Sequence, residues 1–105
     1  MIQRFCNTYF SSQITGAGRG IGREVALQFA QLGCSIVCWD INLTAAKETA
    51  EEVKAVGGKA YAFHCDVSSQ IEVESTANEV RKVVPHVDIV INNAGIINYY
   101  IRFDF

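Results

Sequence analysis

Residues 15–22 of this 105-residue chain read T-G-A-G-R-G-I-G, a glycine-rich segment whose composition suits phosphate binding. It separates a short β-prone segment from the amphipathic run Gly20 to Leu32. Each glycine removes a Cβ that would keep a ligand or a packed helix away from the backbone. A helix that begins there directs free N–H groups and its positive dipole end at a bound anion. The segment therefore predicts a phosphate site, where glycines alone would indicate only a flexible turn.

A carboxylate stands where a nucleotide ribose would need one. Asp40 follows Gly22 by eighteen residues and ends the apolar run from Ser35. A carboxylate at the end of a second strand accepts hydrogen bonds from the adenosine ribose hydroxyls, and it repels a 2′-phosphate. The next two residues include no arginine to receive such a phosphate. NAD is therefore favoured over NADP. Arg19 in the loop argues in the other direction, because a cation there could lie near a 2′-phosphate.

Four strand-like segments alternate with three helical segments. Strands separated by helices of this length imply right-handed crossovers and a parallel sheet, with the expected order 3-2-1-4. The predicted fold class is α/β, a Rossmann-like doubly wound parallel sheet truncated after about four strands. The expected strands are Tyr9–Thr15, Ser35–Asp40, Lys59–Cys65 and Val87–Ile91, and the expected helices are Gly20–Leu32, Leu43–Val56 and Ser69–Val84.

The helix ends carry recognisable signals. Thr44 is a candidate cap for the second helix, and Ser68 or Ser69 opens the third, with Glu72 near the capping-box position. Pro85 is expected to close the third helix.

Composition excludes several classes of protein. The formal charge of −2 and the sequence pI of about 5.6 argue against a nucleic-acid or anionic-membrane surface. The apolar runs are too short for a membrane span, and residues 1–13 contain no apolar region typical of a secretion signal.

The cysteines indicate no metal site. They form no C-x-x-C pair and no zinc-like spacing with either histidine. Three lie in or beside apolar strand-like runs, which is typical of buried reduced thiols and favours a cytoplasmic or cytosol-facing compartment. The four are Cys6, Cys34, Cys38 and Cys65.

Three motifs together identify a family. The glycine-rich segment, C-D-V at residues 65–67 and N-N-A-G at residues 92–95 stand in order at the ends of predicted strands. The chain thereby resembles the short-chain dehydrogenase/reductase family over residues 14–95, with atypical ends at 1–13 and 96–105. The resemblance implies the nucleotide-binding half of an oxidoreductase that moves a hydride between NAD and an alcohol or carbonyl carbon.

The resemblance also implies a set of cofactor contacts. The glycines would shape the pyrophosphate turn, where Arg19 and Ile21 present further contacts. Asp66 and Val67 would meet the adenine ring, and the residues after the fourth strand would border the adenosine ribose and tie that strand to its neighbours. The alternatives are a capping or turn role for Asp66 and turn chemistry for the asparagines. The implied residues are Gly16, Arg19, Gly20, Ile21, Gly22, Asp40, Asp66, Val67, Asn93, Ala94 and Gly95.

A narrower resemblance concerns the substrate. Residues 36–42, I-V-C-W-D-I-N, are similar to the retinol and 17β-hydroxysteroid dehydrogenases, which act on lipophilic alcohols. The implied partner is a small lipophilic alcohol or ketone. Members of that group often carry an N-terminal membrane anchor, and no such segment is expected here.

The catalytic groups of the family are not found. The family uses a tyrosine with a lysine four residues later, because the lysine lowers the tyrosine pKa, together with an upstream serine. Four residues after the four tyrosines stand glutamine, cysteine, phenylalanine and aspartate. No catalytic residue is therefore predicted, and the chain is expected to be inactive alone. The alternatives are a non-catalytic nucleotide-binding or interfering module and a non-functional truncated product.

The first and fourth strands are unusual. The first is expected at the centre of the sheet, yet it contains Ser12 and Gln13. Burying either side chain without a hydrogen-bond partner would reduce the stability of the fold by about 1–3 kcal/mol. The fourth strand would leave an apolar edge open, which favours self-association.

Overall fold

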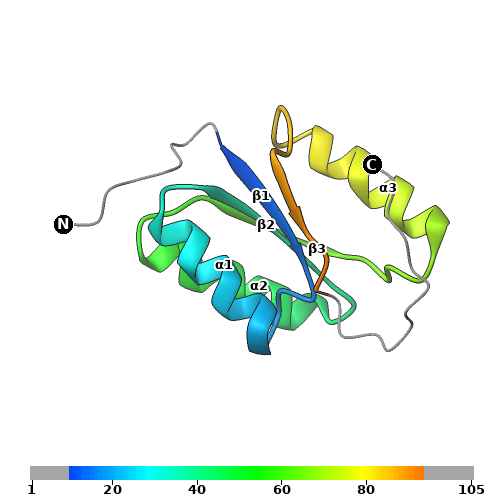
Figure 1. The fold of residues 1–105 in the computed structure, drawn as a ribbon. Helices are drawn as coiled ribbons and strands as arrows, with labels where there is room; N and C mark the ends of the chain where they lie inside the picture. The colour runs from blue at the N-terminus through cyan, green and yellow to red at the C-terminus, as the bar shows by residue number, and fades with distance from the viewer. Residues whose placement is uncertain (1–9, 94–105) are drawn as a thin grey trace.

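The computed structural model describes residues 10–93 and contains a four-stranded parallel sheet with three helices (Figure 1). The strand order is β3-β2-β1-β4, as predicted. The predicted α/β doubly wound class is thereby confirmed. The elements are β1 (Ser11–Thr15), α1 (Gly20–Gln31), β2 (Ser35–Asp40), α2 (Leu43–Ala55), β3 (Ala60–His64), α3 (Gln70–Arg81) and β4 (Ile89–Ile91).

The helices cover both faces of the sheet. Helices α1 and α2 lie on one face and α3 lies on the other (Figure 1). Strand β2 is buried on both faces, so its side chains alternate between two apolar clusters. Ile36 and Cys38 pack with the buried alanines of α1 and α2, whereas Val37 and Trp39 pack with Val80 of α3.

Strand β1 is central and polar, as the sequence predicts. It pairs with β2 on one side and with β4 on the other. Ser12 is fully buried and Gln13 is 4% exposed. Within the described residues, the Ser12 hydroxyl and the Trp39 indole nitrogen are buried without a hydrogen-bond partner. The expected penalty in the first strand is therefore present for Ser12.

Two helix-end predictions are wrong. Helix α2 is capped by Asn42, not by Thr44, because Asn42 has extended backbone angles and its side chain accepts from Ala45 N at 3.1 Å. Helix α3 ends at Arg81, so Pro85 stands beyond its end and does not close it. Ser69, one of the two predicted caps, does cap α3 by accepting from Glu72 N.

Strand β2 has the predicted bounds, and the other three strands are shorter than predicted. Strand β1 begins at Ser11, and the predicted start at Tyr9 lies outside the described residues. Strand β3 lacks one predicted residue at each end. Strand β4 begins at Ile89, although the Asp88 carboxylate accepts from Ser11 N at 2.8 Å and extends the contact between the two strands.

The cysteines follow the prediction in part. Cys38 and Cys65 are buried free thiols. Cys34 is also buried but is disulfide-bonded, so the prediction of a reduced thiol is wrong there. Burial suits a packed disulfide as well as a packed thiol, and the cysteine pattern therefore carries no argument about the compartment. Among residues 10–93, no helix is long and apolar enough to cross a membrane.

Candidate dinucleotide-binding site

The glycine-rich turn connects β1 to α1 and requires glycine for two physical reasons. Gly16 and Gly20 have φ angles of 66° and 60°, in the left-handed region that L side chains rarely adopt. At Gly22, in the first turn of α1, a Cβ would lie 2.2 Å from the Gly16 carbonyl oxygen and 2.5 Å from Asn93 Nδ2. The helix start can therefore approach the turn and the end of β4 only without a side chain at residue 22.

The N-terminus of α1 has no side-chain cap. Its N-cap residue, Arg19, has an extended backbone and makes no side-chain capping bond, and the first turn contains no acidic residue. Arg19, Gly20 and Ile21 are exposed. The first backbone N–H groups of a helix lack intrahelical partners. At α1 these groups and the helix dipole can serve an anion.

Asp40 ties the end of β2 to the turn. Its Oδ2 accepts a hydrogen bond from Gly18 N at 2.8 Å, and its Oδ1 accepts from Asn42 N at 2.9 Å. Gly18 is not among the residues that the sequence predicts for the site. A Cβ there would lie 2.7 Å from Asp40 Oδ2 and 2.6 Å from Ala45 Cβ. The carboxylate is therefore placed beside the predicted phosphate turn, with acceptor capacity left on both oxygens.

Helix α2 also contacts the turn, through a residue that was not predicted from the sequence. Thr49 is fully buried, and its hydroxyl donates to the Ala17 carbonyl at 2.8 Å. The Ala17 N–H in turn donates to the Trp39 carbonyl at 3.1 Å. A threonine on the apolar face of α2, between Ala46 and Val53, was the available signal. Both backbone groups of Ala17, its N–H and its carbonyl, are therefore hydrogen-bonded to neighbouring elements.

Asn93 ties the end of β4 to the same turn. Its backbone N–H donates to Thr15 Oγ1 at 2.8 Å, and its side chain reaches the Gly16 carbonyl at 3.5 Å. The structure thus places Asn93 beside the turn, which agrees with its predicted role in joining the fourth strand to its neighbour. The other two predicted residues, Ala94 and Gly95, lie outside the described residues.

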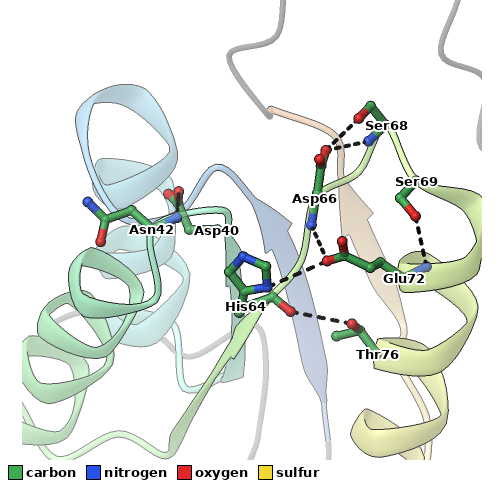
Figure 2. Close-up of polar contacts among 8 residues, drawn as sticks. All are labelled: Asp40, Asn42, His64, Asp66, Ser68, Ser69, Glu72 and Thr76. Carbon is green, nitrogen blue, oxygen red and sulfur yellow. Dashed lines mark hydrogen bonds and ion pairs between the residues drawn. The ribbon is translucent and has the colours of Figure 1, made fainter.

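The end of β3 carries the second acidic position. Asp66 Oδ1 accepts from Ser68 N at 3.0 Å and from Ser68 Oγ at 2.6 Å (Figure 2). These bonds, with a smaller contribution from His64, lower the pKa of Asp66 below its ordinary value. Asp66 therefore has the turn role that the sequence analysis kept as an alternative. Its neighbour Val67 is 7% exposed and belongs to the apolar cluster that contains Trp39 and Val80.

All of these groups gather at the carboxyl ends of parallel strands. The chain places β2 and β3 on one side of β1 and then β4 on the other side, so the sheet has a topological switch point between β1 and β4. Open α/β sheets bind ligands outside the carboxyl ends of the strands at such a point. Gly16, Asp40 and Asp66 follow or end three neighbouring strands at this edge. The arrangement suits a long ligand that carries phosphate near β1 and a nucleoside near β2 and β3.

The described residues offer neither a thiol nucleophile nor a metal centre. Burial, with a smaller effect of Asp40, raises the pKa of Cys38 to about 12. Burial also raises the pKa of Cys65. Among residues 10–93, no group of three or more His, Cys, Asp or Glu side chains could hold a metal ion.

Comparisons with known proteins show which family the chain resembles. A family model described as short chain dehydrogenase matches residues 12–103. The chain is 45% identical over 82 residues to 7alpha-hydroxysteroid dehydrogenase of Escherichia coli (strain K12). It is 48% identical over 85 residues to epidermal retinol dehydrogenase 2 of Mus musculus and 44% identical over 84 residues to estradiol 17-beta-dehydrogenase 11 of Macaca fascicularis. These matches cover 78–80% of this chain but only 28–32% of the relatives.

Solved structures show the same likeness. One is a 7alpha-hydroxysteroid dehydrogenase complexed with NADH and 7-oxo glycochenodeoxycholic acid, with a TM-score of 0.81 and 42% identity. Another is a metagenomic short-chain oxidoreductase in complex with NADP, with a TM-score of 0.81 and 29% identity. The matches cover 85% and 86% of this chain, and 35% and 41% of those chains. The predicted resemblance to the family and to its retinol and 17β-hydroxysteroid group is confirmed.

Proposed function

The chain belongs to the short-chain dehydrogenase family, and on this basis we propose that it is the cofactor-binding part of an oxidoreductase that prefers NAD to NADP. The family binds NAD(P), and one solved relative holds NADH while another holds NADP. The choice between the two cofactors depends on this chain's own residues. The observation that carries the proposal is the hydrogen bond from Gly18 N to the Asp40 carboxylate.

The pyrophosphate is assigned to the glycine-rich turn. Gly16, Gly20 and Gly22 let the backbone approach it, and the uncapped start of α1 supplies N–H donors. Arg19 and Ile21 are exposed beside this position and are proposed as further contacts.

The adenosine ribose is assigned to Asp40. Its carboxylate is held 2.8 Å from the N–H of Gly18, so it cannot turn away from the phosphate turn without losing that bond. A 2′-phosphate placed there would meet a fixed negative charge. This repulsion is the physical basis for the proposed preference for NAD.

The adenine and the far side of the ribose are assigned to the neighbouring strand ends. Asp66 and Val67 are proposed to meet the adenine ring, and Asn93, Ala94 and Gly95 are proposed to border the ribose. Bound NAD would supply the hydride acceptor for an alcohol carbon. No tyrosine of the 105 residues is followed four residues later by lysine. We therefore assign residues 14–95 to cofactor binding and expect no turnover from this chain alone.

The names of the relatives support a proposal for the substrate class. Several act, by name, on hydroxysteroids, estradiol or retinol, all of them lipophilic alcohols. We propose a lipophilic alcohol or ketone as the substrate of the whole protein, of which this chain corresponds to about a third by comparison with those relatives. Self-association through the edge of β4 that pairs with no other described strand remains a further prediction.

The test is the affinity of the 105-residue chain for NAD and NADP, measured by equilibrium dialysis. The wild-type chain should bind NAD more tightly, and Asp40→Asn, which removes the charge at nearly constant shape, should reduce the preference at least fivefold. Glu51→Gln, an exposed acid on α2, is the matched control and should change neither affinity. Equal wild-type affinities, or an unchanged preference in Asp40→Asn, would contradict the assignment to Asp40. Alcohol-dependent reduction of NAD by this chain would contradict the expectation that it binds the cofactor without turnover.

A further inference from the structure

Glu72 connects α3 to the end of β3 through a single carboxylate oxygen. Its Oε1 accepts from Asp66 N at 3.1 Å and lies 3.5 Å from His64 Nδ1 (Figure 2). The backbone N–H of Glu72 also donates to Ser69 Oγ, the cap of α3, at 3.2 Å. In the usual capping box a glutamate at this position bonds the N–H of the cap residue. Here the glutamate instead holds the N–H of Asp66.

A second bond fixes the same helix face to the strand. Thr76, four residues after Glu72, donates from Oγ1 to the His64 carbonyl at 3.4 Å. Residues four apart lie on one face of a helix. Figure 2 shows both side chains pointing from α3 toward His64 and Asp66. The backbone on both sides of Cys65 is therefore held by α3.

These contacts determine how Asp66 can present its carboxylate. Glu72 holds the backbone N–H of Asp66, and both Ser68 donors bond to the same oxygen, Oδ1. Within the described residues, Oδ2 keeps its capacity to accept a hydrogen bond. Because the backbone and one oxygen are fixed, the direction of Oδ2 is fixed as well.

We propose that Glu72 is a positioning residue that makes the site selective for adenine over other purines. The proposal rests on the assignment of Asp66 to the base. With Asp66 held by Glu72, Oδ2 accepts a hydrogen bond from the exocyclic amine of adenine. Hypoxanthine carries a carbonyl at that position, so it would set two acceptors against each other. Without Glu72, Asp66 can turn and the discrimination is lost.

The experiment compares NAD with its hypoxanthine analogue, nicotinamide hypoxanthine dinucleotide, on the full 105-residue chain. The wild-type chain should prefer NAD by about tenfold or more, because tenfold is the lower end of what one hydrogen bond to a charged group contributes. Glu72→Ala should reduce the preference to about twofold, mainly by weakening NAD. Glu72→Gln keeps an oxygen acceptor for Asp66 N and should retain most of the preference. Glu79→Ala, on the same helix but paired with Lys82 instead, is the matched control.

Each result has a distinct meaning. An equal loss of affinity for both dinucleotides in Glu72→Ala would show a structural role only and overturn the proposal. If Glu72→Ala kept the preference for NAD over the hypoxanthine analogue, the proposal would be overturned. It would also be overturned if the wild-type chain bound NAD but showed no such preference. Either result would leave the cofactor site in place. A wild-type chain that binds neither dinucleotide would refute the proposed function itself. Should Glu72→Ala not unfold cooperatively, Glu72→Leu, which has no acceptor but favours the helix, decides by the same criteria.

Discussion

The hydroxyl of Thr49 donates a 2.8 Å hydrogen bond to the carbonyl of Ala17, thirty-two residues earlier in the chain. Both residues are completely buried. The bond satisfies a carbonyl of the glycine-rich turn that no helix or strand ladder would satisfy. The turn that we assign to the pyrophosphate is therefore shaped from behind by α2 as well as by its own glycines.

Thr49→Val should destabilise the chain. Valine matches threonine in shape and in β-branching, so the change mainly removes the hydroxyl and leaves the Ala17 carbonyl unpaired. The expected loss is about 1–3 kcal/mol in the free energy of unfolding. Urea unfolding followed by the fluorescence of Trp39, the single tryptophan, measures it. Thr44→Val, at an exposed position of the same helix, is the control, and equal stability of the two variants would refute the role of the bond.

Gly22→Ala should be more damaging than Gly20→Ala. A Cβ at residue 22 would lie 2.2 Å from a backbone carbonyl oxygen, so the turn itself must shift. We expect a loss of about 3 kcal/mol, the upper end for overpacking. At Gly20 nothing lies within 4 Å of an added Cβ, and only the left-handed φ of 60° opposes alanine. That penalty is about 1–2 kcal/mol. Urea midpoints in the reverse order would contradict the packing argument.

Ser12→Ala should stabilise the chain. The Ser12 hydroxyl is buried in the central strand without a partner in the described part of the chain. Removing it relieves a desolvation penalty of about 1 kcal/mol. Ser12→Thr keeps the hydroxyl and adds a methyl group in a filled core, so it should be no more stable than wild type. Calorimetric melting temperatures test this, and a lower value for Ser12→Ala would show that the hydroxyl does find a partner.

The Asp66–Ser68 contact predicts a specific pH dependence. The bonds from Ser68 lower the pKa of Asp66 below its ordinary value of 3.8. A carboxyl group with a lowered folded-state pKa adds stability above its unfolded-state pKa, and that stability disappears as the pH falls through the folded-state value. Ser68→Ala should therefore be less stable than wild type at pH 7, and the difference should narrow below pH 3.8.

The control for this prediction is the Asp66→Asn background. An amide does not titrate in this range, so the effect of Ser68→Ala there should not change with pH. Stability curves at pH 7, 5 and 3 for the four proteins complete the cycle. If the effect of Ser68→Ala on stability in the wild-type background did not change with pH, the bond would stabilise the fold independently of the charge on Asp66.

The fold class and the outline of the site were predictable because they depend on local patterns. Alternating apolar segments indicated the strands and helices, and chain connectivity limited the strand order to the one observed. The glycine-rich segment and Asp40 were singled out by residue type and spacing, and they lie within the residues that the family model matches, while their cofactor roles stay proposals. Helix ends were less predictable. Thr44 and Asn42 both suit a cap by residue type, and only the backbone angles decide which side chain reaches a free N–H.

What the sequence by itself determined is therefore the order of elements, the family, the glycine-rich turn between β1 and α1, and the two acidic positions, Asp40 and Asp66. The tertiary structure alone decided which polar groups hold those positions. Gly18 faces Asp40, Thr49 faces Ala17, and Glu72 takes the N–H of Asp66. These bonds join residues that are separate in the sequence and meet only when helices pack on the sheet. A residue type states what a side chain can donate or accept, whereas the packed backbone decides which partner lies within hydrogen-bond distance of it.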